Sequence, residues 1–202
     1  MHEIDVIMQK YAYAKQMLET EIDIMIKEFA FQHHYNPVEH IKSRLKENRS
    51  IMGKLAKKNV PYTAENIIKY VDDVIGIRIV CSFLTDVYDI VGLFLQSKNI
   101  VVKERKDYIA FPKDTGYSSY HLIVLVPLYL QNRVEYMEAE IQIRTVAMDF
   151  WASLDHKIQY KFEGEIPSEV KETMKNYSLT IKELDKQMLS LNEIVAKYKK
   201  DL

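Results

Sequence analysis

The chain has 202 residues, of which 48% are hydrophobic and 28% charged, a balance typical of one globular domain with helical extensions. Its formal net charge of −1 argues against a general nucleic-acid coat, because non-specific phosphate binding requires a sustained basic excess. No segment approaches the roughly 20 apolar residues needed to span a bilayer, so we expect a cytoplasmic protein. The single cysteine, Cys81, stands in an apolar run and is expected in the core, since it cannot form an internal disulfide.

The first quarter of the chain is predicted to be helical. Apolar residues recur at helical spacing over residues 3–31, without proline or glycine, which predicts a long amphipathic helix. Asn36 followed by Pro37 is typical of a helix start and predicts a second helix over 37–58.

The middle of the chain changes to the two-residue period of β-strands. Thr63 is expected to cap a short helix that ends near Val71. The further expected elements are strands over 74–83, 100–109, 119–129 and 134–145 and helices over 87–97, 146–161 and 167–199. The segment FEGEIP, between the last two helices, is the one obvious break. Helices around a central sheet indicate an α/β or α+β fold in one domain.

The two terminal helices offer more apolar surface than one small sheet can cover. The last helix carries apolar residues at Val170, Met174, Tyr177, Leu184, Met188, Leu191, Ile194 and Val195. Either the two helices pack on each other or they associate subunits, and the pattern leaves both open.

The strand VEYMEAEIQIRT has one apolar and one polar face. Alternation places Met137, Ala139, Ile141 and Ile143 on one side and Glu138, Glu140, Gln142 and Arg144 on the other. The polar face could be solvated, but bulky apolar residues in the following helix favour an interior position. Interior carboxylates need a cation, and Mg²⁺ with its preference for oxygen ligands meets that need. Alternation does not choose between the two glutamates.

A second acid cluster stands at the entrance to the run VIGIRIVCSF. Asp73 is followed by Arg78 five residues later, and Glu140 is followed by an arginine after four. A structural Asp–Arg salt bridge beside a glycine bulge would explain the first pair alone. The same pattern, an acid followed by an arginine after four or five residues, occurs on two strands, and this favours a metal–phosphate site. Gly76 would leave space for a ligand to approach the backbone.

Basic residues gather before and after these strands. On the predicted helix 37–58, Lys46, Ser50, Lys54 and Lys57 share one arc, which is most often solvated surface. Arg44 lies at the border of that helix's apolar face, where a guanidinium requires a phosphate, carboxylate or aromatic plane. Further basic residues are Lys103, Arg105, Lys106 and Lys113.

The turn DTGY introduces a possible base-binding surface. Tyr117 follows Gly116 and is a candidate stacking platform, although a packing role is equally compatible. His121 alternates with Ser119 and could contact phosphate or sugar. The patterns GxxxxGK[ST], GxGxxG, GxSxG and HExxH do not occur, and no nucleophile–base pair emerges. With these catalytic patterns absent, the remaining interpretation is phosphoryl-type chemistry, which depends on positioning and charge stabilisation.

Five segments in order, IKSRLK, DDVIGIRIVC, KDYIAFPKDTGYSSYH, EIQIRT and AMDFWASLDHKIQYK, resemble the synthetase domain of the RelA/SpoT alarmone synthetases. The resemblance covers residues 37–162 and implies a nucleotidyltransferase-like α+β fold, with a mixed central β-sheet flanked by helices. Residues 1–36 would form an N-terminal packing or oligomerisation helix, and 163–202 a C-terminal helix. Long family members carry a hydrolase domain before this region and regulatory domains after it. Here about 36 residues precede the region and about 40 follow, so we expect a small stand-alone synthetase.

The resemblance implies transfer of pyrophosphate from ATP to the ribose 3′-hydroxyl of GDP or GTP, giving ppGpp or pppGpp and AMP in stringent-response signalling. Carried over to this chain, Asp73 and Glu140 would hold Mg²⁺, and Glu140 would help deprotonate the attacking hydroxyl. The remaining roles are Arg44 and Arg78 at the adenine, Lys46, Lys54, Arg105 and Lys113 at the phosphates, Tyr117 stacked on guanine, and His121, Gln142 and Arg144 near the acceptor.

Two positions depart from the family pattern. Ser118 stands where many members have arginine, which removes a positive charge near the acceptor. Asp149 stands where some small members have asparagine, at a position associated with allosteric activation by the product (p)ppGpp. Small members form tetramers through their terminal helices, so a homotetramer is expected. The competing interpretations are a nucleotidyltransferase that releases pyrophosphate and a catalytically silent nucleotide- or RNA-binding regulator.

Overall fold

The computed structural model describes residues 2–162 and 166–200, so residues 163–165 of the predicted break FEGEIP lie outside the described part. Its centre is one five-stranded sheet in the order β1-β2-β5-β4-β3. The strands are β1 (Val38–Leu45), β2 (Ile75–Cys81), β3 (Val101–Asp107), β4 (Tyr120–Leu130) and β5 (Arg133–Thr145). The β2–β5 pair is parallel and the other three pairs are antiparallel. The predicted α+β fold with a mixed sheet is therefore confirmed.

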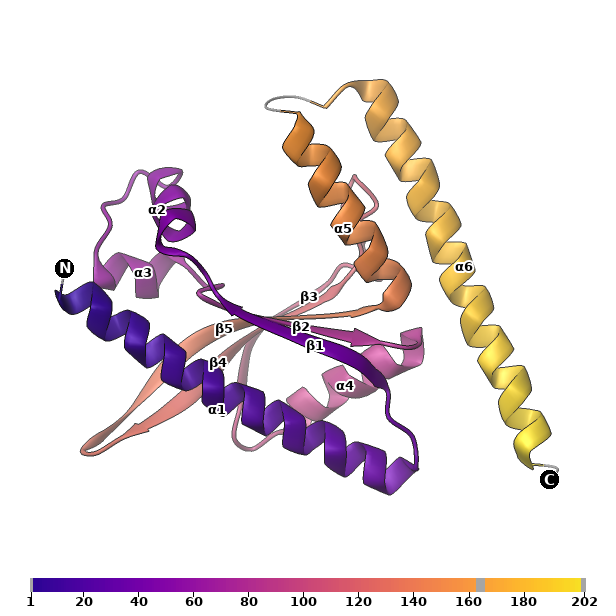
Figure 1. Ribbon diagram of the computed structural model, residues 1–202, viewed down its shortest axis with the longest axis horizontal. Coiled ribbons are helices and arrows are strands. Elements are labelled where there is room, and N and C mark those ends of the chain that lie inside the picture. The colour runs from indigo at the N-terminus through magenta and orange to yellow at the C-terminus, as the bar shows by residue number, and fades with distance from the viewer. Residues whose placement is uncertain (1, 163–165, 201–202) are drawn as a thin grey trace.

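The helices lie around this sheet (Figure 1). They are α1 (His2–His33), α2 (Asn48–Ala56), α3 (Ala64–Tyr70), α4 (Leu84–Gln96), α5 (Val146–Lys161) and α6 (Ser168–Lys200). Thr63 caps α3 as expected, because its hydroxyl accepts a hydrogen bond from the Asn66 amide at 3.2 Å. Among the described residues, no helix is long and apolar enough to cross a membrane.

The predicted helix over 37–58 is wrong in its first half, which forms the edge strand β1. The Asn36 side chain accepts from the Val38 amide at 3.1 Å, a local turn that leads into the strand instead of capping a helix. From Val38 to Leu45 the backbone pairs with β2, and this ladder outweighs the helical spacing of the apolar residues. Helix α2 begins only after Glu47, which occupies its N-cap position.

The apolar face of the sheet is buried beneath α1 and α4. Ile75, Ile77 and Ile79 of β2 join one hydrophobic cluster with Leu18 of α1 and Phe94 of α4. Helix α1 lies across the sheet and contacts β4, β1 and β5 (Figure 1). Since strand side chains alternate, this burial sends the intervening polar residues of β2 and β5 to the opposite face.

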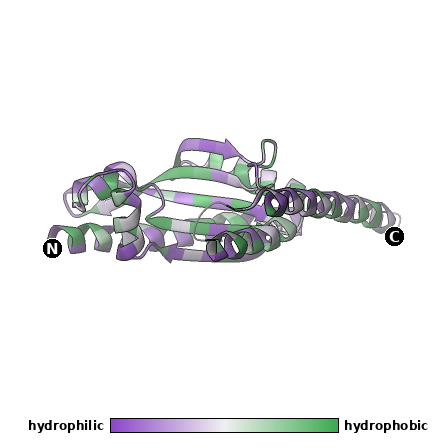
Figure 2. Ribbon diagram, turned by 90° about the horizontal axis from the view of Figure 1, so that it is seen from above, coloured by the Kyte–Doolittle hydropathy of each residue, from purple (hydrophilic) through white to green (hydrophobic). Residues whose placement is uncertain are grey.

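The terminal helices are both formed, but they pack on different parts of the molecule. Helix α1 packs on the sheet, whereas α6 packs on α5 and α4 and projects beyond the sheet (Figure 2). Its exposed apolar residues include Tyr177, Leu179, Leu184, Met188, Leu191, Ile194, Val195 and Tyr198. Cys81 is fully buried, as expected, and burial raises the pKa of its thiol to about 12.

We predict that Leu18→Ala lowers the free energy of unfolding by about 2–5 kcal/mol, because it opens a cavity where α1 meets the sheet. Leu18 is 0% exposed, whereas its neighbour Met17 is 36% exposed. The matched control Met17→Ala is expected to change stability by less than about 1 kcal/mol. Urea denaturation at one fixed protein concentration measures both, and equal losses would contradict this account of the core.

Candidate active site

The polar face of the sheet carries a pocket where β1, β2 and β5 meet. The parallel register places Gly76 opposite Glu140 and Arg78 opposite Gln142, and β1 adds Arg44 opposite Gly76. The hollow has a volume of about 210 Å³, and its lining consists of Lys42, Ser43, Arg44, Gly76, Ile77, Arg78, Glu140 and Gln142. Four predicted site residues from three strands thus meet in one place.

The side chain of Arg44 lies over Gly76. A methyl group added at Gly76 would stand 3.5 Å from Nε and 3.6 Å from Cγ of Arg44, which is ordinary contact distance. The predicted place of Arg44, at the rim of a helix, is wrong, because this residue lies on β1. Its side chain nevertheless shares the pocket with Arg78, as the predicted adenine-binding role requires.

Asp73 lies just before β2 and is held by two lysines. Its carboxylate oxygens lie 2.7 Å from Nζ of Lys46 and 3.0 Å from Nζ of Lys54. Burial alone would raise the pKa of Asp73, but the hydrogen bonds and charges of both lysines outweigh burial and lower it. The predicted arc of lysines on one helix face is wrong, because Lys46 lies before α2. Lys46 and Lys54 nevertheless both contact Asp73.

Glu140 is the acid of β5 that faces the pocket. Its carboxylate lies 3.1 Å from Nδ1 of His121 and accepts from Nε2 of Gln142 at 2.9 Å. Burial raises its pKa, the contacts with His121 and Gln142 lower it, and the net shift is downward. The negative charge of Asp73 acts in the opposite sense and raises the pKa of Glu140. Glu138 instead forms an ion pair with Lys103.

A hydrogen-bonded chain continues from Glu140 to the predicted acceptor residues. The hydroxyl of Tyr117 lies 2.8 Å from Nε2 of His121 and accepts from Nη2 of Arg144 at 3.0 Å. Arg144 is 1% exposed, and burial lowers its pKa. Lys113 stands 5.0 Å from the ring centre of Tyr117. The structure therefore brings Tyr117, His121 and Arg144 together with Glu140.

Asp149 of α5 joins the two arginine sites, a contact that the sequence analysis missed. One of its carboxylate oxygens lies 3.2 Å from Nη1 of Arg78 and 3.5 Å from Nη1 of Arg144. Only the position of an acid three residues into a helix after EIQIRT could have suggested it. The acid therefore places one negative charge between the guanidinium groups of β2 and β5.

Arg105 is a predicted site residue that lies away from the pocket and from the contacts described above. It lies on the edge strand β3 opposite Leu122 and lines a separate hollow with Phe94 and Ser97. The cause is the strand register, because the partner Leu122 belongs to the buried apolar face. The role of Arg105 at a phosphate stays a prediction.

The donor set suits Mg²⁺ better than a closed metal site. Among residues 2–162 and 166–200, no group of three or more His, Cys, Asp or Glu side chains could hold a metal ion. Mg²⁺ typically takes one or two carboxylates and completes its octahedron with water and substrate phosphates. Asp73 and Glu140 match that requirement.

We predict that replacing Asp73 with Asn removes part of the acid sensitivity of the fold. A lowered folded-state pKa means that ionised Asp73 contributes stability above its unfolded pKa of about 3.9, and that this contribution is lost as pH falls through the folded pKa. The wild type should therefore be more stable than Asp73→Asn at pH 7, and the difference should shrink below about pH 4. Melting temperatures from pH 7 to pH 3 test this, and a constant difference would contradict it.

Comparison with known proteins gives the family of this chain. The family described as "Region found in RelA / SpoT proteins" matches residues 43–165. GTP pyrophosphokinase YwaC of Bacillus subtilis (strain 168) is 42% identical over 185 residues, 92% of this chain and 88% of that protein.

Two solved structures extend the likeness to the fold. The small alarmone synthetase 2 from Bacillus subtilis superposes with a TM-score of 0.82 at 40% identity, covering 92% of this chain and 96% of that one. The small alarmone synthetase 1 from the same organism, bound to its product pppGpp, has a TM-score of 0.83 at 33% identity, covering 93% and 95%. The chain belongs to the RelA/SpoT family.

Proposed function

We propose that this chain is a (p)ppGpp synthetase that transfers the β,γ-diphosphate of ATP to the 3′-hydroxyl of GDP or GTP. The observation that carries the proposal is that Glu140 lines the arginine-containing pocket and also contacts His121 of the Tyr117 network, while Asp73 with its two lysines stands just before the neighbouring strand β2. The relatives named GTP pyrophosphokinase and small alarmone synthetase support it.

ATP binds on the β1–β2 side. The guanidinium groups of Arg44 and Arg78 offer flat cationic surfaces for the adenine ring, and both line the pocket. Lys46 and Lys54 neutralise the phosphates. Both lysines are tied to Asp73 in the free protein, so an incoming polyphosphate replaces one set of ion pairs with another.

GDP or GTP binds on the β4–β5 side. The guanine stacks on Tyr117, whose hydroxyl is fixed by His121 and Arg144. Lys113 already lies over this ring, so stacking moves its ammonium group away from the ring and toward the nucleotide phosphates.

The transfer is an in-line displacement at the β-phosphorus of ATP. The acceptor 3′-oxygen forms a bond to that phosphorus, the bond to the bridging oxygen of the α-phosphate breaks, and AMP leaves with the electron pair. Glu140, ionised at neutral pH, accepts the proton of the 3′-hydroxyl. Asp73 and Glu140 would hold Mg²⁺, which would supply charge neutralisation on the phosphates.

The exposed apolar residues of α1 and α6 support association into the homotetramer predicted from the family resemblance. A cytoplasmic location and regulation by the product (p)ppGpp or by RNA belong to the same proposal. Nucleotide binding without turnover would support the silent regulator instead.

We predict that Glu140→Gln lowers kcat by about 100-fold or more, because the amide neither accepts the proton nor binds the metal as an anion. The matched control is Glu138→Gln, on the same strand face but paired with Lys103, which should keep most of the activity. Incubation with ATP, GTP and Mg²⁺ followed by nucleotide separation measures tetra- and pentaphosphate and AMP. Absence of these products in the wild type, or equal activity of wild type and Glu140→Gln, would refute the proposal.

We predict that Ser118→Arg alters the preference between GDP and GTP, since it adds a positive charge beside the acceptor loop. Values of kcat/KM with each acceptor at saturating ATP give the ratio. Identical ratios for the wild type and the variant would show that position 118 does not influence acceptor choice.

A further inference from the structure

Helix α6 is docked to the domain through one narrow stripe. Met174, Ser178 and Asp185 are buried at helical spacing, while most of the other described residues of α6 are exposed. The stripe contacts two segments of the candidate acceptor site, namely the loop that precedes β4 and the end of β5. The two contacts join residues of the motif segments, Gly116 and Thr145, to Ser178 and Asp185 of α6, which lie outside those segments.

The first contact holds the loop at Gly116. This residue has φ of 79°, a conformation that favours glycine, and a Cβ added there would lie 1.9 Å from Oγ and 2.3 Å from Cβ of Ser178. The loop is a tight turn, because the Gly116 amide donates to the Lys113 carbonyl at 2.8 Å and the Lys113 amide donates to the Tyr117 carbonyl at 3.1 Å. A shift of Gly116 therefore moves Tyr117.

The second contact fixes α6 to the end of β5. The Thr145 hydroxyl donates to Oδ2 of Asp185 at 2.7 Å in a buried bond, and it accepts from the Met148 amide at 3.2 Å. Thr145 directly follows Arg144, which binds the hydroxyl of Tyr117. Asp185 thus ties α6 to the strand and to the first turn of α5.

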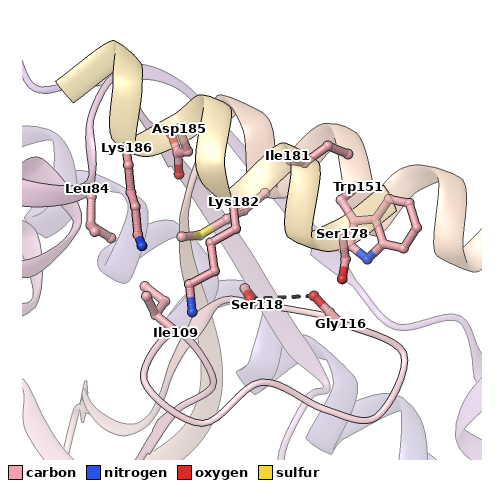
Figure 3. A pocket seen from close by; sticks show the side chains of 11 residues that line it. Leu84, Ile109, Gly116, Ser118, Trp151, Ser178, Ile181, Lys182, Asp185 and Lys186 are labelled. Atoms are coloured by element: carbon pink, nitrogen blue, oxygen red, sulfur yellow. Dashed lines mark hydrogen bonds between the residues drawn. The ribbon is translucent and has the colours of Figure 1, made fainter. Parts of the chain in front are cut away.

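The space between the two contacts is small. It measures about 40 Å³, against about 210 Å³ for the pocket where β1, β2 and β5 meet. Figure 3 shows Ser178 above Gly116 and the side chains of Lys182 and Lys186 extending toward the same loop. Trp151 lines this space, and its Nε1 has no hydrogen-bond partner among the described residues. The volume is that of a packing gap between helix and loop.

We propose that α6 is a positioning element of the acceptor site, in which Ser178 sets the place of Gly116 and Tyr117 while Asp185 anchors the helix to β5. This rests on the proposed function, because the positioned nucleotide is the acceptor GDP or GTP. Arg44 and the two lysines of Asp73 make their contacts on the β1–β2 side, whereas Arg78 reaches the acceptor side through Asp149, so we expect a change at Ser178 to act mainly on the acceptor.

The test changes Ser178 and reads the two substrates separately. Ser178→Leu pushes Gly116 outward and should raise the KM for GTP about 10- to 100-fold, with the KM for ATP within about twofold of wild type. Thr180→Leu adds the same side chain on the exposed side of α6 and should leave both constants unchanged. Equal effects on both substrates, or none, would overturn the proposal.

A rescue experiment separates positioning from loss of structure. Gly116→Ala should raise the KM for GTP through backbone strain and through collision with Ser178. The double variant Gly116→Ala/Ser178→Gly removes only the collision and should recover part of the loss. If the double variant is no better than Gly116→Ala alone, the contact does not set the loop.

A readout without catalysis keeps this proposal distinct from the proposed function. Trypsin cleavage after Lys113 in the loop should be faster in Ser178→Leu than in Thr180→Leu, and the emission of Trp151, the single tryptophan, should shift only in Ser178→Leu. Absence of pyrophosphate transfer in the wild type refutes the proposed function alone. Equal cleavage rates and emission in the two variants overturn the positioning role of α6.

Discussion

The parallel register of β2 with β5 is the constraint on which the site depends. It sets Gly76 beside Glu140 and Arg78 beside Gln142. A slip of one residue would send these side chains to the buried face, because strand side chains alternate. Ile75, Ile77 and Ile79 prevent this slip, because they must stay buried beneath α1 and α4. Burial of the apolar face therefore determines which side chains lie on the opposite, polar face.

The acids of this site are held by neighbouring side chains before any substrate binds. Asp73 is paired with two lysines and Asp149 with two arginines, and Glu140 lies within hydrogen-bond distance of His121 and Gln142. Buried charges are tolerated only when they are paired, so this arrangement lets a charge-rich face fold in a chain of net charge −1. When substrates bind, phosphates would pair with the basic side chains and a metal ion would pair with the carboxylates. Each new ion pair would replace an existing contact, so little reorganisation of the fold is required.

Patterns with a strong local cause predicted the fold well. The long helices follow from continuous helical periodicity without glycine or proline, and Thr63 caps α3 as its residue type indicates. The segment 38–45 was predicted incorrectly because its apolar spacing suits a helix, while its actual stability comes from hydrogen bonds to β2, a partner 30 or more residues later. Long-range pairing of this kind leaves little trace in a local pattern.

For the site, the sequence by itself determined the residue types and the polar face of β5, because side-chain alternation needs no tertiary contact. Alternation could not choose between Glu138 and Glu140, and only the family resemblance named Glu140. The tertiary structure places Glu140 in the pocket lining and pairs Glu138 with Lys103. The structure also decided that Asp149 bridges two arginines and that Ser178 abuts Gly116, since both contacts depend on how helices α5 and α6 dock. Docking is set by three-dimensional packing, which no single segment encodes.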